Sequence, residues 1–197
     1  MSTTQIVSWI VVAVIVFWAV GAYNRLVRLR NAIANAFAQI DVQLKRRYDL
    51  IPNLVEVARK YVQHERETLE AVIAARNQAR AAADGARARP TAAGAVTSLA
   101  MAEEVLGSAM GRLMAVVEQY PELKADDSLR ELSEELTSTE NKVAFARQLF
   151  NDATLDYNVA VQEFPTRILS TLFGFREAAM LQSTANEAER AAPRVTL

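Results

Sequence analysis

The chain has 197 residues, of which 51% are apolar, and its 22 basic and 23 acidic side chains leave a formal net charge of -1. This balance gives no reason to expect a nucleic-acid partner. Because the chain contains no cysteine, disulfides and thiolate chemistry are excluded. Sparse glycine and proline favour helices, and the length suits one domain with appendages.

Residues 6–22, IVSWIVVAVIVFWAVGA, carry no charged side chain and predict a membrane-spanning helix. Such a helix covers about 25 Å, and its uncharged flanks extend it to the ~30 Å thickness of the hydrocarbon layer. A cleaved signal peptide is the alternative, but it needs a positive charge that MSTTQ lacks. We therefore expect an uncleaved anchor within residues 1–23.

The orientation of this anchor follows from the charges after it. Arg25, Arg28 and Arg30 follow within one or two helical turns, and Asp41 is the first acidic residue. Lysine and arginine are retained on the cytoplasmic side of a membrane. We expect the N-terminus outside and the long C-terminal part in the cytoplasm.

The anchor continues into a helix with one apolar face, which Pro52 interrupts. Apolar residues recur at spacings of three and four up to Leu44, with no breaker between them and the anchor. Proline in mid-helix is costly, but it is well tolerated in a first turn. Either Pro52 kinks one rod that reaches Ala83, or the chain reverses near Tyr48–Pro52. The reversal is favoured, because a single rod would leave half of its apolar seam without partners.

Two further helices are expected before the chain's clearest repeat. The second runs from Val55 to Ala83 and ends in a loop over Asp84–Gly94, DGARARPTAAG, which contains two glycines and a proline. The third covers Leu99–Tyr120 and is stopped by Pro121. An Asp or Ser within residues 126–128 can cap the next helix.

The fourth helix has a heptad repeat, with a period of seven residues, that ends before Pro165. Its bulky row contains Leu129, Leu136, Val143, Phe150, Tyr157 and Phe164, and its companion row contains Leu132, Thr139, Ala146, Ala153 and Ala160. One bulky and one small row permit close interdigitation with a neighbouring helix. We predict an all-α fold in which the single transmembrane helix is followed by an antiparallel up-and-down four-helix bundle over residues 24–175.

This topology places two charged turns together at the end of the bundle far from the membrane. The basic turn is Lys45–Arg47, and the acidic turn contains Glu122, Asp126 and Asp127. Opposite charges attract, so the two turns can meet within one bundle or between bundles.

Several motifs resemble chemical sites only in part. His64 begins HERET, but Thr68 stands where a zinc protease has its second histidine, which favours an exposed helical histidine. The GSAMG motif at Gly107–Gly111 has its serine second, so it is no nucleophile elbow, and its small residues favour close helix packing. We identify no catalytic, cofactor-binding or metal-binding residue, require no cofactor, and expect no enzyme.

Glu65 and Arg76 are unusual because they fall on the apolar seam of the second helix. One interpretation is a partly buried ion-pair network that fixes helix register. A ligand or proton site and a solvent-exposed seam edge are the alternatives. Expected partners on the fourth helix are Glu140, Asn141 and Arg147.

The end of the chain divides into an apolar segment and a polar tail. The segment TRILSTLFGF, residues 166–175, either caps the base of the bundle or lies in the headgroup region as a short amphipathic helix. The tail from Glu177 to Leu197 is rich in Ala, Glu and Arg, and we expect residues 176–197 to be disordered.

Several of these segments resemble the LemA family of bacterial membrane proteins. The resemblance covers nearly the whole chain: the anchor, the stretch from Tyr23 to Arg76, YPELKA, ELTSTENKVAFARQLFNDATLDYN and FPTRILSTLFGF, and it is most specific at RYDLIPNL, residues 47–54. It implies an antiparallel four-helix bundle behind one anchor. Family members commonly carry further aromatics soon after FGF, and REAAMLQSTANEAERAAP departs from that pattern.

The resemblance also directs the functional expectation. Family members are discussed as membrane scaffolds or remodelling proteins, including relatives in magnetosome formation, and some of their genes neighbour a membrane metalloprotease. We expect an inner-membrane scaffold that contacts lipid, forms a homo-oligomer, and is able to shape or organise the membrane. The alternative is an adaptor or signalling partner of another membrane protein, such as a metalloprotease.

Overall fold

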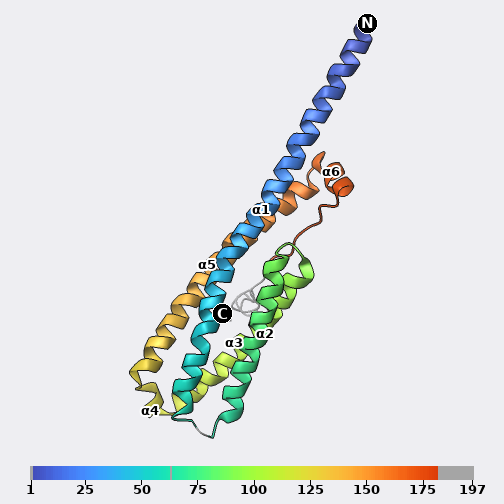
Figure 1. Cartoon of the computed structure of the whole chain (residues 1–197). Coiled ribbons are helices and arrows are strands. Elements are labelled where there is room, and N and C mark those ends of the chain that lie inside the picture. The colour runs from blue at the N-terminus through green and yellow to red at the C-terminus, as the bar shows by residue number, and fades with distance from the viewer. Residues whose placement is uncertain (1, 63, 182–197) are drawn as a thin grey trace, which may run out of the picture.

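The protein is all-helical in the computed structural model, which describes residues 2–62 and 64–181 (Figure 1). No strand occurs in these ranges. The helices are α1 (Thr3–Arg59), α2 (Arg66–Ala88), α3 (Ala93–Gln119), α4 (Pro121–Lys124), α5 (Asp127–Gln162) and α6 (Thr166–Phe173). The all-α prediction is confirmed.

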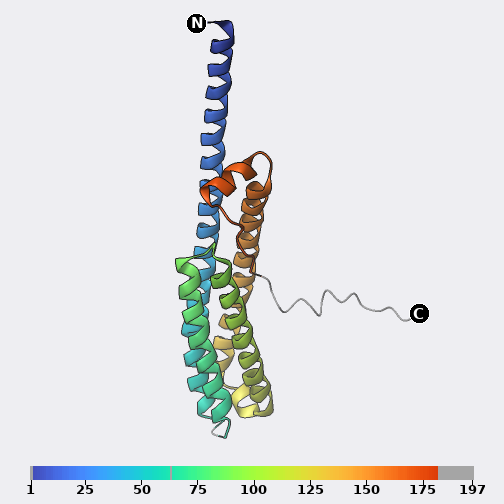
Figure 2. The same cartoon turned by 90° about the vertical axis from the view of Figure 1, so that its right-hand side faces the viewer.

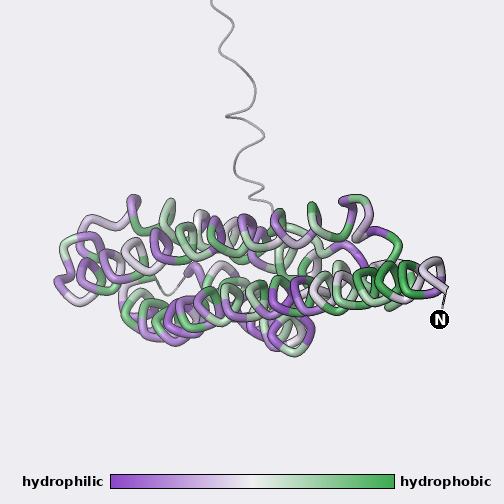
Figure 3. The backbone as a smooth tube through the Cα atoms, turned by 90° about the horizontal axis from the view of Figure 1, so that it is seen from above, coloured by the Kyte–Doolittle hydropathy of each residue, from purple (hydrophilic) through white to green (hydrophobic). Residues whose placement is uncertain are grey.

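Helix α1 is a single rod that joins the apolar N-terminus to the rest of the molecule. Its 57 residues span about 85 Å at ~1.5 Å per residue. The N-terminal part projects beyond all other helices, and its residues are apolar (Figures 2 and 3). It contains an 18-residue window that is long and apolar enough to cross a membrane and is 0% buried. From Leu26 onward, one face of α1 is buried.

The predicted reversal near Tyr48–Pro52 is wrong, because α1 continues through Pro52 to Arg59. Pro52 has no N–H to donate to the carbonyl oxygen of Tyr48, four residues earlier. The Arg76 side chain of α2 donates instead, with Nε 2.8 Å from that oxygen. The buried carbonyl is therefore paired, and the helix has no need to end at the proline.

The chain reverses about two to three helical turns later than expected, and the next loop is shorter than expected. Lys60–Glu65 connects α1 to α2, and α2 continues through Gly85 to Ala88. Only Arg89–Ala92 remains of the predicted loop at Asp84–Gly94. Gly85 is helical because a single glycine costs a helix only about 1 kcal/mol.

Helices α1, α2, α3 and α5 run side by side, alternately away from and back toward the N-terminal end (Figure 1). We call α2, α3, α5 and α1 from Leu26 onward the helical body. Within it α5 packs on α1, α1 on α2, and α2 on α3. Along the described residues α3 and α5 do not pack closely on each other. The four-helix bundle predicted over residues 24–175 is therefore not confirmed.

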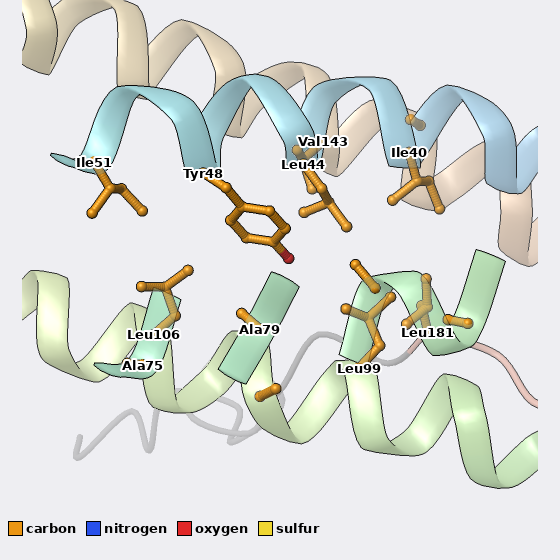
Figure 4. Packing of buried hydrophobic residues seen from close by; sticks show 14 of the residues in the cluster. Ile40, Leu44, Tyr48, Ile51, Ala75, Ala79, Leu99, Leu106, Val143 and Leu181 are labelled. Carbon is orange, nitrogen blue, oxygen red and sulfur yellow. The ribbon is translucent and has the colours of Figure 1, made fainter. Parts of the chain in front are cut away.

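The repeat on α5 lies at the core, with one exception. Leu129, Leu136, Val143, Phe150 and Tyr157 are buried. Phe150 meets Phe37 of α1 edge to face, with ring centroids 5.8 Å apart. Phe164 lies beyond the end of α5 and is 81% exposed. Figure 4 shows how apolar side chains from α1, α2, α3 and α5 meet in the interior.

Residues 176–181, here called the strap, occupy the side of the helical body between α3 and α5. After α6 the chain turns back along the body (Figure 2). Ala178 and Leu181 of the strap are buried, and three side chains of α5 bond to its backbone. The expectation of disorder from residue 176 is therefore wrong for the strap. Residues 182–197, the rest of that predicted tail, lie outside the described residues.

Candidate functional site

Tyr23, the residue that follows the apolar segment, is held by the C-terminal part of the chain. The rings of Phe173 and Phe175 both pack edge to face against it, with centroids 5.1 and 5.6 Å away. Gly174 lies between them with a φ of 72° and ends α6. This left-handed conformation favours glycine and lets both phenylalanines contact Tyr23. Helix α6 is thus fixed where α1 leaves the helical body.

Helix α6 is amphipathic, with its two faces in different surroundings. Thr166, Leu169 and Ser170 are buried, and the Ser170 hydroxyl donates to the Val161 carbonyl at 2.9 Å. Ile168 and Leu172, which are one helical turn apart, are 61% and 74% exposed. One face therefore caps the helical body, as the first sequence alternative proposed. The other face is apolar and has no protein covering it among the described residues.

Basic side chains follow Tyr23 on α1, and Arg167 precedes Ile168 on α6. Arg25 pairs with Glu163 at 3.2 Å, at the junction of α5 and α6. Arg28, Arg30 and Arg167 are exposed. An exposed apolar face and arginine side chains are both typical of helices that lie at the surface of an anionic membrane.

A second polar cluster lies inside the helical body, around Tyr48. Arg47 of α1 and Glu103 of α3 are paired at 2.7 Å, with side chains that are 10% and 11% exposed. The Tyr48 hydroxyl donates to the other oxygen of Glu103 at 2.5 Å. Burial, together with the negative charge of Glu103, raises the pKa of Tyr48 well above its ordinary value. These bonds join α1 to α3.

A cavity of about 400 Å³ borders this cluster between α1, α3 and α5. Its charged lining comes from Arg47, Glu103, Glu104, Glu140 and Arg147, and Leu181 of the strap lies at its edge. A Cβ atom added at Gly107 or Gly111 would meet nothing within 4 Å. The prediction that the small residues of GSAMG permit close helix packing is therefore wrong for the two glycines, although Ala109 is buried, and Gly107 lines the cavity.

Comparison with known proteins identifies the family. The LemA family model matches residues 36–197, most of the chain. The chain belongs to the LemA family. The match begins inside α1, after the apolar segment, and covers the rest of this LemA protein.

Two similar curated proteins are magnetosome proteins. Magnetosome protein MamQ of Magnetospirillum gryphiswaldense is 37% identical over 83 residues, which are 42% of this chain and 30% of MamQ. Magnetosome protein MamQ 2 of Paramagnetospirillum magneticum is 37% identical over 76 residues, 39% of this chain and 28% of the relative. The similarity therefore spans less than a third of these relatives.

The basic turn predicted at the distal end is absent, because Lys45, Arg46 and Arg47 lie inside α1. Lys45 pairs with Asp41 at 2.8 Å, Arg46 pairs with Glu135, and Arg47 is buried with Glu103. Arg46 and Arg47 therefore join α1 to α5 and α3, and Lys45 pairs within α1, instead of facing the acidic turn. The sequence expectation failed because it placed the reversal at Pro52.

The acidic turn does lie at the distal end, where it meets a tyrosine. The Tyr61 hydroxyl donates to Asp126 at 2.8 Å, and the other oxygen of Asp126 accepts the Leu129 N–H at 3.0 Å. Asp126 thus caps the N-terminus of α5, as the sequence predicted. The bond from Tyr61 and the backbone bond from Leu129 lower the pKa of Asp126.

The remaining candidates do not assemble into one site. His64 is exposed in the turn before α2, not in a helix. Glu65 immediately precedes α2, and its carboxylate accepts from the Thr68 hydroxyl at 3.5 Å. Arg76 pairs weakly with Asp49 at 3.8 Å besides its bond to Tyr48, so Glu140, Asn141 and Arg147 are not its partners. A buried network does exist, but it centres on Arg47 and Glu103. Sequence reasoning missed Glu103 because it stands next to Glu104, and no periodic pattern in the sequence distinguishes the largely buried glutamate from the exposed one.

Proposed function

We propose that this LemA protein is a membrane-anchored scaffold that self-assembles at the bacterial inner membrane and organises it, with the helical body in the cytoplasm. The observation that carries the proposal is the continuity of α1, which passes from the candidate membrane span into the core without a break. A helix of this length transmits the position and tilt of its anchor directly to the body. The body therefore has a defined orientation relative to the lipid.

Helix α6 supports this assignment independently of the anchor. Its exposed apolar face lies beside Tyr23, at the level where the span ends. Burial of such a face in the headgroup layer removes apolar surface from water at about 25 cal/mol per Å². Two attachments, a span and a surface helix, restrict the rotation of the body on the membrane.

The names of the relatives agree with a role at a membrane. MamQ and MamQ 2 are magnetosome proteins, and the region that this chain shares with them covers part of each. Confining copies of a protein to a membrane plane raises their effective concentration, so weak lateral contacts suffice for assembly. The shared region is therefore suited to build an ordered layer on the membrane.

The mass of the full-length protein in lipid tests the self-assembly. The protein is purified in mild detergent, transferred to nanodiscs of phosphatidylcholine and phosphatidylglycerol, and measured by native mass spectrometry. We expect an oligomer in the nanodiscs. A uniform monomer in both detergent and nanodiscs would contradict the proposed scaffold function.

Thiol labelling tests the orientation, because the natural chain has no cysteine. Ser2→Cys should react with an impermeant maleimide on intact spheroplasts, since the N-terminus is outside. Thr91→Cys, in the connection between α2 and α3, should react only after lysis. The reverse pattern would place the helical body outside the cytoplasm.

A further inference from the structure

Two asparagines of α5 hold the strap in place. The Asn158 amide donates to the Ala178 carbonyl and accepts the Ala178 N–H, both at 2.9 Å. Asn151 makes the same pair of bonds with Leu181, at 3.1 and 2.9 Å. Each amide uses both its donor and its acceptor on one residue, so the two asparagines fix the position of the strap along α5.

The end of α6 is held against α1. Phe173 and Phe175 pack on Tyr23, with ring centroids 5.1 and 5.6 Å away. The Phe175 N–H donates to the Ser170 carbonyl at 2.9 Å, which ties the residues after Gly174 back to α6. The end of α6 therefore cannot shift without moving Phe175.

The connection between α6 and the strap is too short to absorb a movement. Arg176 and Glu177 alone separate Phe175 from Ala178, and an extended chain covers only about 10 Å over that interval. The Tyr157 hydroxyl of α5 donates to the Arg176 carbonyl at 2.9 Å, so the connection is itself attached. A displacement of α6 is therefore passed on to the strap, and release of the strap frees the end of α6.

The strap also lies in the gap between α3 and α5. These two helices do not pack closely on each other along the described residues. Ala179 and Met180 line one cavity that α3 and α5 share with the strap. Leu181 borders the other cavity, of about 400 Å³, which α1 also lines. The strap therefore contributes to the walls of both cavities.

Removal of the strap from this gap would expose apolar side chains. Ala178 and Leu181 are both 5% exposed, and Leu181 lies near Leu99 and Ile40 in the interior (Figure 4). Burial of these groups favours the strap in the gap, and the bonds of the two asparagines add to that preference. The gap is therefore closed as long as the strap stays bound.

We propose that the strap couples the contact of α6 with lipid to the closure of the gap between α3 and α5. The inference rests on the lipid contact of α6 in the proposed function and adds its consequence for the helical body. When lipid covers Ile168 and Leu172, α6 stays against Tyr23 and the strap stays in the gap. When that contact is lost, the strap leaves the gap more often, and both cavities open.

The coupling acts in both directions. Lipid favours the bound strap only if α6 binds lipid better when the strap is bound. The strap supplies that difference, because it fixes the end of α6 and with it the direction in which Ile168 and Leu172 point. Without the strap, the Ser170 hydroxyl still holds α6 to the Val161 carbonyl, but the end of α6 is free. By linkage, weakening the strap weakens the lipid contact by the same factor.

Hydrogen exchange of the full-length protein in nanodiscs of phosphatidylcholine and phosphatidylglycerol tests the first direction. Ile168→Ser with Leu172→Ser removes the apolar contact with lipid, and peptides that cover the strap should then exchange about fivefold faster or more. Peptides around Tyr48 should exchange at an unchanged rate, because the interior stays folded. Val42→Ser with Phe145→Ser replaces exposed apolar groups on the helical body, and this matched control should leave the exchange of the strap unchanged.

Variants of the two asparagines test the reverse direction. An environment-sensitive fluorophore on Thr171→Cys, an exposed position of α6, reports lipid contact by emission at shorter wavelength in the same nanodiscs. Asn151→Asp with Asn158→Asp removes the two amide donors and should reduce that shift by about half or more. Asn141→Asp, exposed on the same helix, is the matched control and should leave the shift unchanged. Exchange of the peptides around Tyr48 shows that each variant is folded.

The outcomes separate this inference from the proposed function. If the natural α6 face gives the shift in emission but its serine variant leaves the exchange of the strap unchanged, lipid contact is kept and the coupling is overturned. A shift that the variant of the two asparagines does not reduce also overturns the coupling. Faster exchange in the strap and around Tyr48 alike would mean a general loss of stability, which contradicts it too. Emission as in water from the natural face overturns the coupling together with the lipid contact, and self-assembly is decided separately by mass.

Discussion

The interior around Tyr48 and the outer face of α6 differ in what they leave unsatisfied. In the interior, polar groups from three helices are paired: Glu103 with Arg47 and the Tyr48 hydroxyl, and Arg76 with the Tyr48 carbonyl. On α6, Ile168 and Leu172 face outward without a protein partner among the described residues. The first region is explained by the chain's own contacts. The second leaves apolar surface exposed, and we propose that lipid covers it.

The largest effect is expected when Glu103 is removed from the interior. Glu103→Leu leaves Arg47 with only Glu140, at 3.8 Å, and leaves the Tyr48 hydroxyl without an acceptor. Unpairing a buried charge costs about 3 kcal/mol of the free energy of unfolding. Chemical denaturation in detergent measures this loss.

Matched variants show whether that loss comes from the unpaired charge. Glu104→Leu, at the exposed neighbouring position, should change the free energy of unfolding by less than about 0.5 kcal/mol. Replacing both partners, Arg47→Met with Glu103→Leu, should restore much of the stability. Equal losses in the single and double variants would contradict a stabilising role for the pair.

A smaller effect is expected from the arginine that supports Pro52. Arg76→Met leaves the buried Tyr48 carbonyl unpaired, which should cost about 1–3 kcal/mol. In a Pro52→Ala background, the new N–H can bond to that carbonyl, so the same substitution should cost much less. The difference, measured by denaturation of all four proteins, is the coupling between the two residues. Arg80→Met, exposed on α2, is the control, and purely additive losses would show that Arg76 does not compensate for the proline.

Pro52 and Arg76 also show where sequence reasoning reached its limit. The apolar helix at the N-terminus and the heptad repeat on α5 could be predicted from the sequence, because each pattern depends on residues close together in the chain. The continuation of α1 through Pro52 depends on a bond from a residue on another helix. A local pattern contains no trace of such a bond.

The strap was missed for a related reason. Its contacts with α5 are mainly backbone bonds to the Asn151 and Asn158 amides, so its own composition predicts disorder. The two asparagines are seven residues apart on α5, a spacing that is visible in the sequence but has no meaning until a peptide lies beside it. For residues 166–175 the sequence left a cap and a headgroup helix open; α6 has a capping face, and its contact with lipid stays a prediction.

Alkaline pH should lower the free energy of unfolding moderately, through the interior around Tyr48. Burial and Glu103 raise the pKa of Tyr48, so the folded protein keeps the proton that an unfolded tyrosine loses near pH 10. The contribution of the protonated Tyr48 to the free energy of unfolding is therefore fully present below about pH 10. It is lost as the pH rises above that value, by up to roughly 1.4 kcal/mol per pH unit. Tyr48→Phe should flatten this decline relative to the natural chain. Parallel curves for both proteins between pH 9 and 11 would show that Tyr48 is not the group that titrates.

The smallest effect on stability is expected from substitutions on the exposed face of α6. There we expect a change in lipid contact instead of a loss of stability. Ile168→Ser with Leu172→Ser replaces exposed apolar groups by polar ones, so the free energy of unfolding in detergent should change by no more than about 0.5 kcal/mol. Leu169→Ser on the buried face is the matched control and should cost about 2 kcal/mol or more. Equal losses in both variants would mean that the exposed face is part of the core.

The same variants separate lipid contact from solvent exposure. An environment-sensitive fluorophore on Thr171→Cys, an exposed position of α6, should emit at shorter wavelength in nanodiscs than in water, because the face lies in the headgroup layer. Ile168→Ser with Leu172→Ser should remove that shift, whereas both proteins should keep their anchor in the nanodisc. Anionic lipid should increase the shift, since Arg28, Arg30 and Arg167 are exposed nearby. If the fluorophore on the protein with Ile168 and Leu172 emits as it does in water, α6 only caps the helical body. Lipid contact at α6 would then be contradicted, and the proposed attachment to the membrane would rest on the anchor.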